Sequence, residues 1–155
     1  TCLPKLQFPI LNYTRIFMEI RLATRDDLKA IDEFDIFLGN RMTEIERSEL
    51  WVAVKENVVI AYISFNEQFY KRPFVHYLNV RKEYRRSGAG RFLMLKFEEL
   101  YRQSERLFTS TESNNLPMLL LLEKLGYKCC GVVDKIQKES EIIFCKDLNP
   151  SESKS

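Results

Sequence analysis

The chain has a single histidine, four cysteines and almost no net charge, and these shortages exclude several kinds of function. Its 155 residues carry 24 basic and 22 acidic side chains, so a formal net charge of +2 gives no general attraction to nucleic acid or to a membrane surface. The cysteines (Cys2, Cys129, Cys130 and Cys145) show no Cys-x-x-Cys or Cys/His spacing of a zinc site. We therefore expect no metal, no nucleic-acid partner, and reduced thiols in a cytoplasmic protein.

Long apolar runs are also missing, and none approaches the length of a membrane-spanning helix. Residues 1–17 are apolar and aromatic, but prolines and basic side chains interrupt them and they have no signal-peptide core. We expect residues 1–17 to be an N-terminal extension, residues 18–148 to form one domain, and residues 149–155 to be a polar tail. With 45% hydrophobic residues, a chain of this length can bury a sizeable core.

Glycine is scarce as well, with five in the chain, yet two of them stand together in Gly88-Ala89-Gly90. They follow an apolar strand that ends at Val80 and precede an amphipathic helix. Glycine allows the backbone to approach a ligand, and the first N–H groups of a helix have no intrahelical partner and carry partial positive charge. This turn is therefore a candidate anion site.

Two other glycine loops do not fit this segment. A dinucleotide fingerprint requires a third glycine where Leu93 stands, and no Gly-x-x-x-x-Gly-Lys-Ser/Thr occurs in the chain. The basic residues around the turn are Arg81, Lys82, Arg85, Arg86 and Arg91. Such a local cluster suits a polyphosphate better than a duplex, although a solvated basic turn would have the same composition.

Two motifs together carry a resemblance to a known family. Arg85-x-x-Gly88-x-Gly90 resembles the acyl-CoA pyrophosphate loop of the GNAT acetyltransferase superfamily. Further along, an apolar helix after Asn115 ends in Lys124-Leu125-Gly126-Tyr127, which is similar to the Lys-Leu-Gly-Phe/Tyr segment of the same family. Both occur in the family's order, and the resemblance covers roughly residues 19–148.

Strand and helix patterns alternate along the chain. Strands are expected at 19–22, 51–55, 58–65, 74–80, 106–111, 127–133 and 141–146. Helices are expected from Thr24 to Leu38, whose apolar residues share one face, and over 41–49, 88–104 and 115–125. Glu56-Asn57 predicts a tight hairpin. The expected fold class is α/β (mixed α+β), and the resemblance implies a GNAT-like, mostly antiparallel central sheet with helices on both faces.

The resemblance implies acetyl transfer from acetyl-CoA to a primary amine of a small molecule, protein or peptide in a ternary complex. The family positions that hold the CoA pyrophosphate correspond here to Arg85, Arg86, Ser87, Gly88, Ala89 and Gly90. Leu78 and Val80 would align the pantetheine, and the Leu78 N–H would stabilise the oxyanion on the thioester carbonyl. Asn115 would contact the pantetheine arm, although a helix N-cap is an alternative role.

The sequence is less informative about which residues transfer protons during catalysis than about which residues bind CoA. Many family members have a tyrosine acid where this chain has Leu122, and Tyr127 falls on a position that is more often core. His76 is the candidate base, because strict strand alternation would place it on the face of Leu78 and Val80. A hydrogen bond across the sheet is the alternative role for His76. Glu67 is the second candidate, against a solvated hairpin carboxylate.

A function of a different class stays open. The leucine at position 122 favours a CoA-binding GNAT-like module with weak or no transferase activity, acting as a regulatory or interaction subunit. Consumption of acetyl-CoA with a broad amine panel distinguishes the two. The acceptor is not defined by the sequence: Glu44, Glu46 and Glu49 would attract a cationic amine, but a charged helix is usually a solvated face. A monomer and a homodimer are both compatible with the chain.

Overall fold

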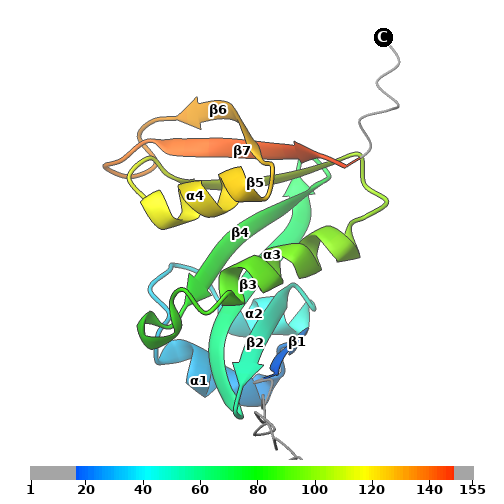
Figure 1. Cartoon of the computed structure of the whole chain (residues 1–155), viewed down its shortest axis with the longest axis vertical. Coiled ribbons are helices and arrows are strands. Elements are labelled where there is room, and N and C mark those ends of the chain that lie inside the picture. The colour runs from blue at the N-terminus through cyan, green and yellow to red at the C-terminus, as the bar shows by residue number, and fades with distance from the viewer. Residues whose placement is uncertain (1–16, 149–155) are drawn as a thin grey trace, which may run out of the picture.

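The computed structural model describes residues 17–148, and the expectations for residues 1–16 and 149–155 lie outside the described residues. Seven strands form one sheet in the order β1-β2-β3-β4-β5-β7-β6 (Figure 1). They are β1 (Met18–Leu22), β2 (Leu50–Lys55), β3 (Val58–Phe69), β4 (Arg72–Val80), β5 (Arg106–Glu112), β6 (Lys128–Val133) and β7 (Glu141–Asp147). Every pairing is antiparallel except β4–β5, which confirms the expected fold class.

Helices cover both faces of the sheet, and each face has its own core. The helices are α1 (Leu28–Asp32), α2 (Arg41–Glu46), α3 (Ala89–Leu100) and α4 (Leu116–Lys124), with 3₁₀ turns at Arg25–Asp27 and Lys82–Tyr84. The α3-side core contains Leu93, Phe97 and Leu122. The α1-side core contains Ile31 and Tyr62. Tyr62 and its neighbour Ile63 on β3 enter opposite cores because strand side chains alternate.

The first helical segment is much shorter than the sequence pattern predicts. Thr24 and Asp27 form the expected capping box, with the Thr24 N–H donating to the Asp27 carboxylate at 2.7 Å. The helix nevertheless ends at Asp32, and Leu38 is 88% exposed rather than on the buried face. The reason is a buried ion pair: Arg41 binds Asp35 and donates to the Leu38 carbonyl at 2.6 Å, which fixes the segment as a loop.

The β2–β3 hairpin has the turn that the sequence predicts, whereas the β3–β4 hairpin has a shorter turn than expected. Glu56 and Asn57 both have the positive φ of the expected tight turn. The second hairpin was expected to have a loop over 67–73, whereas β3 continues to Phe69 and only Tyr70 and Lys71 turn, at φ 52° and 60°. A contact between aromatic rings explains the extension, since the ring centroids of Phe69 and Phe74 lie 4.7 Å apart across the hairpin, with the rings tilted by 44°.

Residues 17–148 contain neither a helix suited to span a membrane nor a cluster of side chains suited to bind a metal ion. None of the helices there is long and apolar enough to cross a membrane. In the same range, no three or more His, Cys, Asp or Glu side chains gather as a metal site would require.

Candidate functional site

The parallel strands β4 and β5 pair over only two residues and then separate. Phe74 and Val75 pair with Phe108 and Thr109, and the Thr109 hydroxyl donates to the Val75 carbonyl at 3.1 Å where the pairing ends. Beyond this point β4 is paired with β3 alone, and β5 with β7 alone. Figure 1 shows β4 and β5 running apart, and the region between the diverging strands is here called the fork; along it, residues 76–80 of β4 have no partner in β5.

The backbone N–H groups of Leu78 and Val80 face the fork. The N–H of Arg81 donates to the Ile60 carbonyl of β3 at 2.8 Å. N–H groups of successive strand residues point to opposite edges, so those of residues 78 and 80 point away from β3. The side chains of Leu78 and Val80 pack against the α3-side core. The fork therefore has hydrogen-bond donors along one edge and an apolar floor.

The glycine turn, residues 85–90, joins the end of β4 to α3. Gly88 is the N-cap with a left-handed φ of 87°, and the first helical hydrogen bond runs from the Phe92 N–H to the Gly88 carbonyl. The N–H groups of residues 89–91 therefore precede the helical ladder. Within the described residues, only that of Ala89 has a protein acceptor, the Ser87 hydroxyl at 3.4 Å. Free donors at a positive helix end are suited to an anion.

The backbone conformation requires a glycine at position 88, whereas Gly90 keeps the space beside it free of a side chain. A Cβ on Gly88 would lie 3.2 Å from the Phe92 ring, in addition to the strained φ. A Cβ on Gly90 would lie 3.6 Å from both Leu78 and Leu121, so this glycine leaves open the space between β4 and α4. A branched side chain there would fill the space next to the fork. The turn thus presents unpaired backbone N–H groups with no side chain from Gly88 or Gly90 beside them.

The arginines near the glycine turn have two different roles, so fewer basic side chains surround the turn than the sequence predicts. Arg85, Arg86 and Arg91 are exposed beside the glycine turn. Arg81 points to the other side of the sheet, where it donates to the carbonyls of Val59 at 2.7 Å and Ala30 at 2.9 Å. These contacts tie α1 to the sheet, so Arg81 is structural and does not belong to the anion site.

Helix α4 borders the opposite side of the fork. The Asn115 side chain accepts from the Met118 N–H at 3.3 Å, so the expected N-cap exists, and its Nδ2 group remains available as a donor. Leu121 approaches Gly90, as its 3.6 Å spacing to the Cβ position indicates. Leu122 is fully buried in the α3-side core. A residue at position 122 therefore belongs to the core in this chain.

His76 lies on the face opposite to the expected one, because β4 contains a β-bulge. Ser64 pairs with Tyr77 and Phe65 pairs with Val75, which leaves His76 without a partner opposite. The extra residue lets Val75 and Leu78, three positions apart, both enter the α3-side core. The His76 Nε2 hydrogen-bonds to the Asn66 Oδ1 at 2.8 Å, on the face of the α1-side core.

The hydrogen bond to Asn66 determines which ring nitrogen of His76 carries the proton. Because the Asn66 oxygen can only accept, Nε2 carries the proton and Nδ1 is the basic nitrogen. Burial lowers the pKa of His76 below its ordinary value, although the charge of Glu49 opposes the shift. The ring is therefore neutral at pH 7 and can accept a proton.

The two remaining candidates lie away from the fork. Glu67 is exposed, and its charge, together with that of Glu49, adds to burial in raising the pKa of the Tyr101 hydroxyl at the far end of α3. Tyr127 is 4% exposed, and burial next to Glu98 raises the pKa of its hydroxyl far above the ordinary value. Neither side chain is placed to exchange a proton at the fork.

Comparison with known proteins identifies the family. A profile described as the acetyltransferase (GNAT) family matches residues 13–127. The chain therefore belongs to the GNAT family of acetyltransferases. Its resemblance to acyl-CoA-dependent acetyltransferases is thereby confirmed at the level of the family. No curated protein matches the sequence.

Solved structures of other GNAT proteins have the same fold. The ribosomal-protein-alanine N-acetyltransferase of Brucella melitensis superposes with a TM-score of 0.72 at 22% identity, over 84% of this chain and 99% of that one. Ard1 of Thermoplasma volcanium gives 0.75 at 13% identity, over 84% and 97%. A putative streptothricin acetyltransferase of Bacillus anthracis, solved with acetyl coenzyme A, gives 0.72 at 16% identity, over 85% and 98%.

Within this GNAT domain, the structure adds Ser110 to the candidates. Ser110 is the first residue of β5 beyond the β4–β5 pairing. Its neighbours Thr109 and Thr111 are buried, so Ser110 faces the other side of the sheet, as His76 does. The sequence gives no signal for Ser110, because its place depends on the register between strands. The bulge at His76 did have a signal, since apolar residues at 75, 78 and 80 break a simple alternation.

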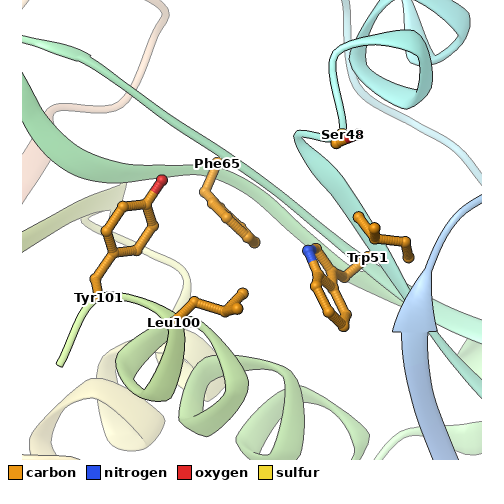
Figure 2. A pocket seen from close by; sticks show the side chains of 6 residues that line it. Ser48, Trp51, Phe65, Leu100 and Tyr101 are labelled. Atoms are coloured by element: carbon orange, nitrogen blue, oxygen red, sulfur yellow. The ribbon is translucent and has the colours of Figure 1, made fainter.

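The domain also has a pocket, which Figure 2 shows from close by. It has a volume of about 280 Å³ and is lined by Leu22, Ser48, Trp51, Phe65, Leu100 and Tyr101. Leu100 and Tyr101 stand at the end of α3, about 18 Å from the glycine turn for a helix of 12 residues. The pocket therefore cannot be part of the same anion site.

Proposed function

We propose that this GNAT protein is a cytoplasmic N-acetyltransferase that moves an acetyl group from acetyl-CoA to a primary amine of a small molecule, protein or peptide. The amine would attack directly in a ternary complex. The observation that supports this best is the fork, where free N–H groups of β4 lie beside the free N–H groups that begin α3. Acetyl-CoA supplies the activated acetyl group as a thioester.

Three parts of the chain would bind and orient the co-substrate. The N–H groups of Gly88, Gly90 and Arg91, with the Arg85, Arg86 and Ser87 side chains, would hold the pyrophosphate. Leu78 and Val80 would align the pantetheine, and the Asn115 Nδ2 would donate to it. The Leu78 N–H would donate to the thioester carbonyl oxygen, where negative charge develops during attack.

His76 would accept the proton of the attacking amine through Nδ1. Its neutral state and its exposure on the face opposite α3 support this role, and Ser110 on the same face could orient the amine. On this arrangement the amine would approach from the α1 side of the sheet, while the pyrophosphate is held at the α3 end. Glu67 is the weaker candidate because it lies beside Tyr101.

Cofactor binding is tested by thermal unfolding with CoA and with pantetheine. A ligand at 100 times its Kd adds about 2.7 kcal/mol of stability, so CoA should raise Tm by roughly 5–10 °C and pantetheine by far less. Arg85→Ala should weaken CoA binding by about 1–3 kcal/mol, the value of a charge-assisted hydrogen bond. Arg102→Ala, an exposed arginine beyond the other end of α3, is the matched control and should bind CoA normally. Equal shifts from both compounds would overturn the assignment.

Catalysis is tested by acetyl-CoA consumption with a panel of polyamines, amino acids and short peptides. His76→Ala should lower kcat by about 10²–10⁴ with an unchanged KM for acetyl-CoA, and Glu67→Gln should have little effect. The neutral imidazole is the active form, so the rate should fall on the acidic side, below the ordinary histidine pKa of about 6.5. That acidic limb should disappear in the variant. The reverse ranking of the two variants would transfer the role to Glu67.

The buried Leu122 favours a second candidate, a CoA-binding module with weak or no transfer. Among the described residues the fork has no tyrosine hydroxyl on α4 to protonate the leaving thiolate. A thiolate leaves readily near neutral pH, so the acid is helpful rather than required. CoA binding without turnover of any amine in the panel would support the module.

A further inference from the structure

Three free thiols lie on the hairpin formed by β6 and β7. Cys129 and Cys130 are consecutive residues of β6, and Cys145 is in β7. Cys129 and Cys130 are exposed and Cys145 is half-buried. Strand β6 is the last strand of the sheet, so within residues 17–148 its outer edge has no neighbouring strand. All three thiols are outside the fork and have no part in the proposed transfer reaction.

The strand register separates these thiols into two groups. Lys128 is opposite Cys145, Cys129 is opposite Phe144, and Gly131 is opposite Ile143. Cys130 is the extra residue of a β-bulge between them and has no residue opposite. Because a bulge increases the local twist and releases one residue from the ladder, the Cys130 side chain can turn toward β7.

Cys130 and Cys145 share one face, and Cys129 lies on the other. Phe144 packs against the α3-side core, so its partner Cys129 faces that side. Cys145 pairs with Phe108 of β5 and faces away from this core. Burial, and next to it the neighbouring Cys145 thiol, raises the pKa of Cys130 to about 11, whereas the Arg106 guanidinium opposes this shift.

We propose that Cys130 and Cys145 form a reversible oxidation site, in which hydrogen peroxide links them by a disulfide across the β6–β7 hairpin. Because its raised pKa keeps Cys130 protonated, Cys145 is the residue that attacks a peroxide oxygen as a thiolate, giving a sulfenic acid and hydroxide. The second thiol attacks the sulfenic sulfur and expels water. In total, two thiols lose two protons and two electrons to one hydrogen peroxide, which becomes two water molecules.

The position of the pair makes this closure possible. Disulfides require Cα atoms about 4.4–6.8 Å apart, and Cys130 and Cys145 stand on adjacent, paired strands with Cys130 released from the ladder by the bulge. The bond would close a loop that contains Ser140, whose carbonyl accepts from the Ser113 N–H at 2.8 Å just after β5. Oxidation would therefore tether the outer strand and limit its fraying.

The test uses the full chain with Cys2→Ser, which removes the one thiol outside the described residues. Protein at low concentration is treated with hydrogen peroxide and analysed by intact mass and peptide mapping, with Cys129→Ser, Cys130→Ser and Cys145→Ser variants alongside. We expect a loss of two hydrogen atoms, a link between the Cys130 and Cys145 peptides, and recovery on treatment with dithiothreitol. Cys129→Ser, the matched control, should oxidise like the parent.

Thermal unfolding gives an independent readout. Oxidised parent and oxidised Cys129→Ser should unfold about 5–10 °C above their reduced forms, whereas Cys130→Ser and Cys145→Ser should show no such rise. A link through Cys129, a link between two chains, or oxidation that stops at added oxygen would overturn the proposal. So would an equal rise in Tm in all three variants. None of these results depends on acetyl transfer.

Discussion

Replacing Arg41 by methionine should cost about 3–5 kcal/mol of unfolding free energy. Its side chain is 2% exposed and lies between the carboxylates of Asp35, at 3.1 Å, and Glu44, at 2.7 Å. Its guanidinium also stacks 4.4 Å from the centre of the Tyr77 ring. Removing one partner of a buried ion pair leaves the other charges without compensation, which is the costly case. For a urea m-value of about 2 kcal/mol/M, the midpoint should fall by about 2 M.

Two further variants separate charge from geometry. Arg41→Lys keeps the charge but cannot bind both carboxylates and the Leu38 carbonyl, so its loss should be intermediate. Arg25→Met removes an arginine whose side chain is 73% exposed and paired with Glu46, and should change stability by less than about 0.5 kcal/mol. Equal effects of Arg41→Met and Arg25→Met would contradict the buried-pair argument.

The pH dependence of Arg41→Met provides a second check. Burial already raises the pKa of Glu44, and the charge of Arg41 is the largest effect that opposes the rise. Without Arg41 the folded-state pKa rises further. A raised folded-state pKa gives stability that is present at low pH and is lost as pH rises through that value. The deficit of the variant should therefore shrink from pH 7 to pH 5. A constant deficit would show that the carboxylates are hydrated in the variant.

Two other predictions concern local structure. Gly88→Ala should cost about 1–2 kcal/mol in urea unfolding because of its φ of 87° and the Phe92 contact at 3.2 Å, whereas Gly131→Ala, whose Cβ would lie 3.9 Å from Ile143, should be nearly neutral. The hydrogen bond from Arg21 lowers the pKa of Asp27, so Asp27→Asn should lose about 1–3 kcal/mol at pH 7. This contribution is present above the unfolded-state pKa of about 3.9 and disappears as pH falls through the lowered folded-state value, so parent and variant should converge at acidic pH.

Features decided by neighbouring residues could be predicted from the sequence. The Thr24 capping box, the Glu56-Asn57 turn, the left-handed Gly88 and the Asn115 cap all depend on contacts within a few positions. The Asp27 and Asn115 side chains accept from backbone N–H groups nearby, and Asn57 and Gly88 are residue types that readily adopt a positive φ. The position of the glycine turn between β4 and α3 could be predicted for the same reason.

Features decided by distant contacts could not be predicted. The helical pattern continues to Leu38, but the Arg41 ion pair with Asp35 and the Tyr62 hydroxyl bond to Asp35 end the helix early. Arg81 reads as part of the basic turn, yet its partners, the Ala30 and Val59 carbonyls, come from other elements. Side-chain direction at these positions is set by tertiary packing, which overrides a local pattern.

The bulge at His76 links the two halves of the candidate site. It lies directly after Val75, where β4 and β5 cease to pair, and a bulge increases the twist of its strand. The twist turns β4 away from β5 and thereby opens the fork. The same extra residue shifts the alternation by one, so that the Leu78 side chain enters the α3-side core while its N–H faces the fork. It also leaves His76 on the opposite face. A strand without the bulge would place neither the proposed oxyanion donor nor the proposed base where they are, so the two assignments depend on one feature of the backbone.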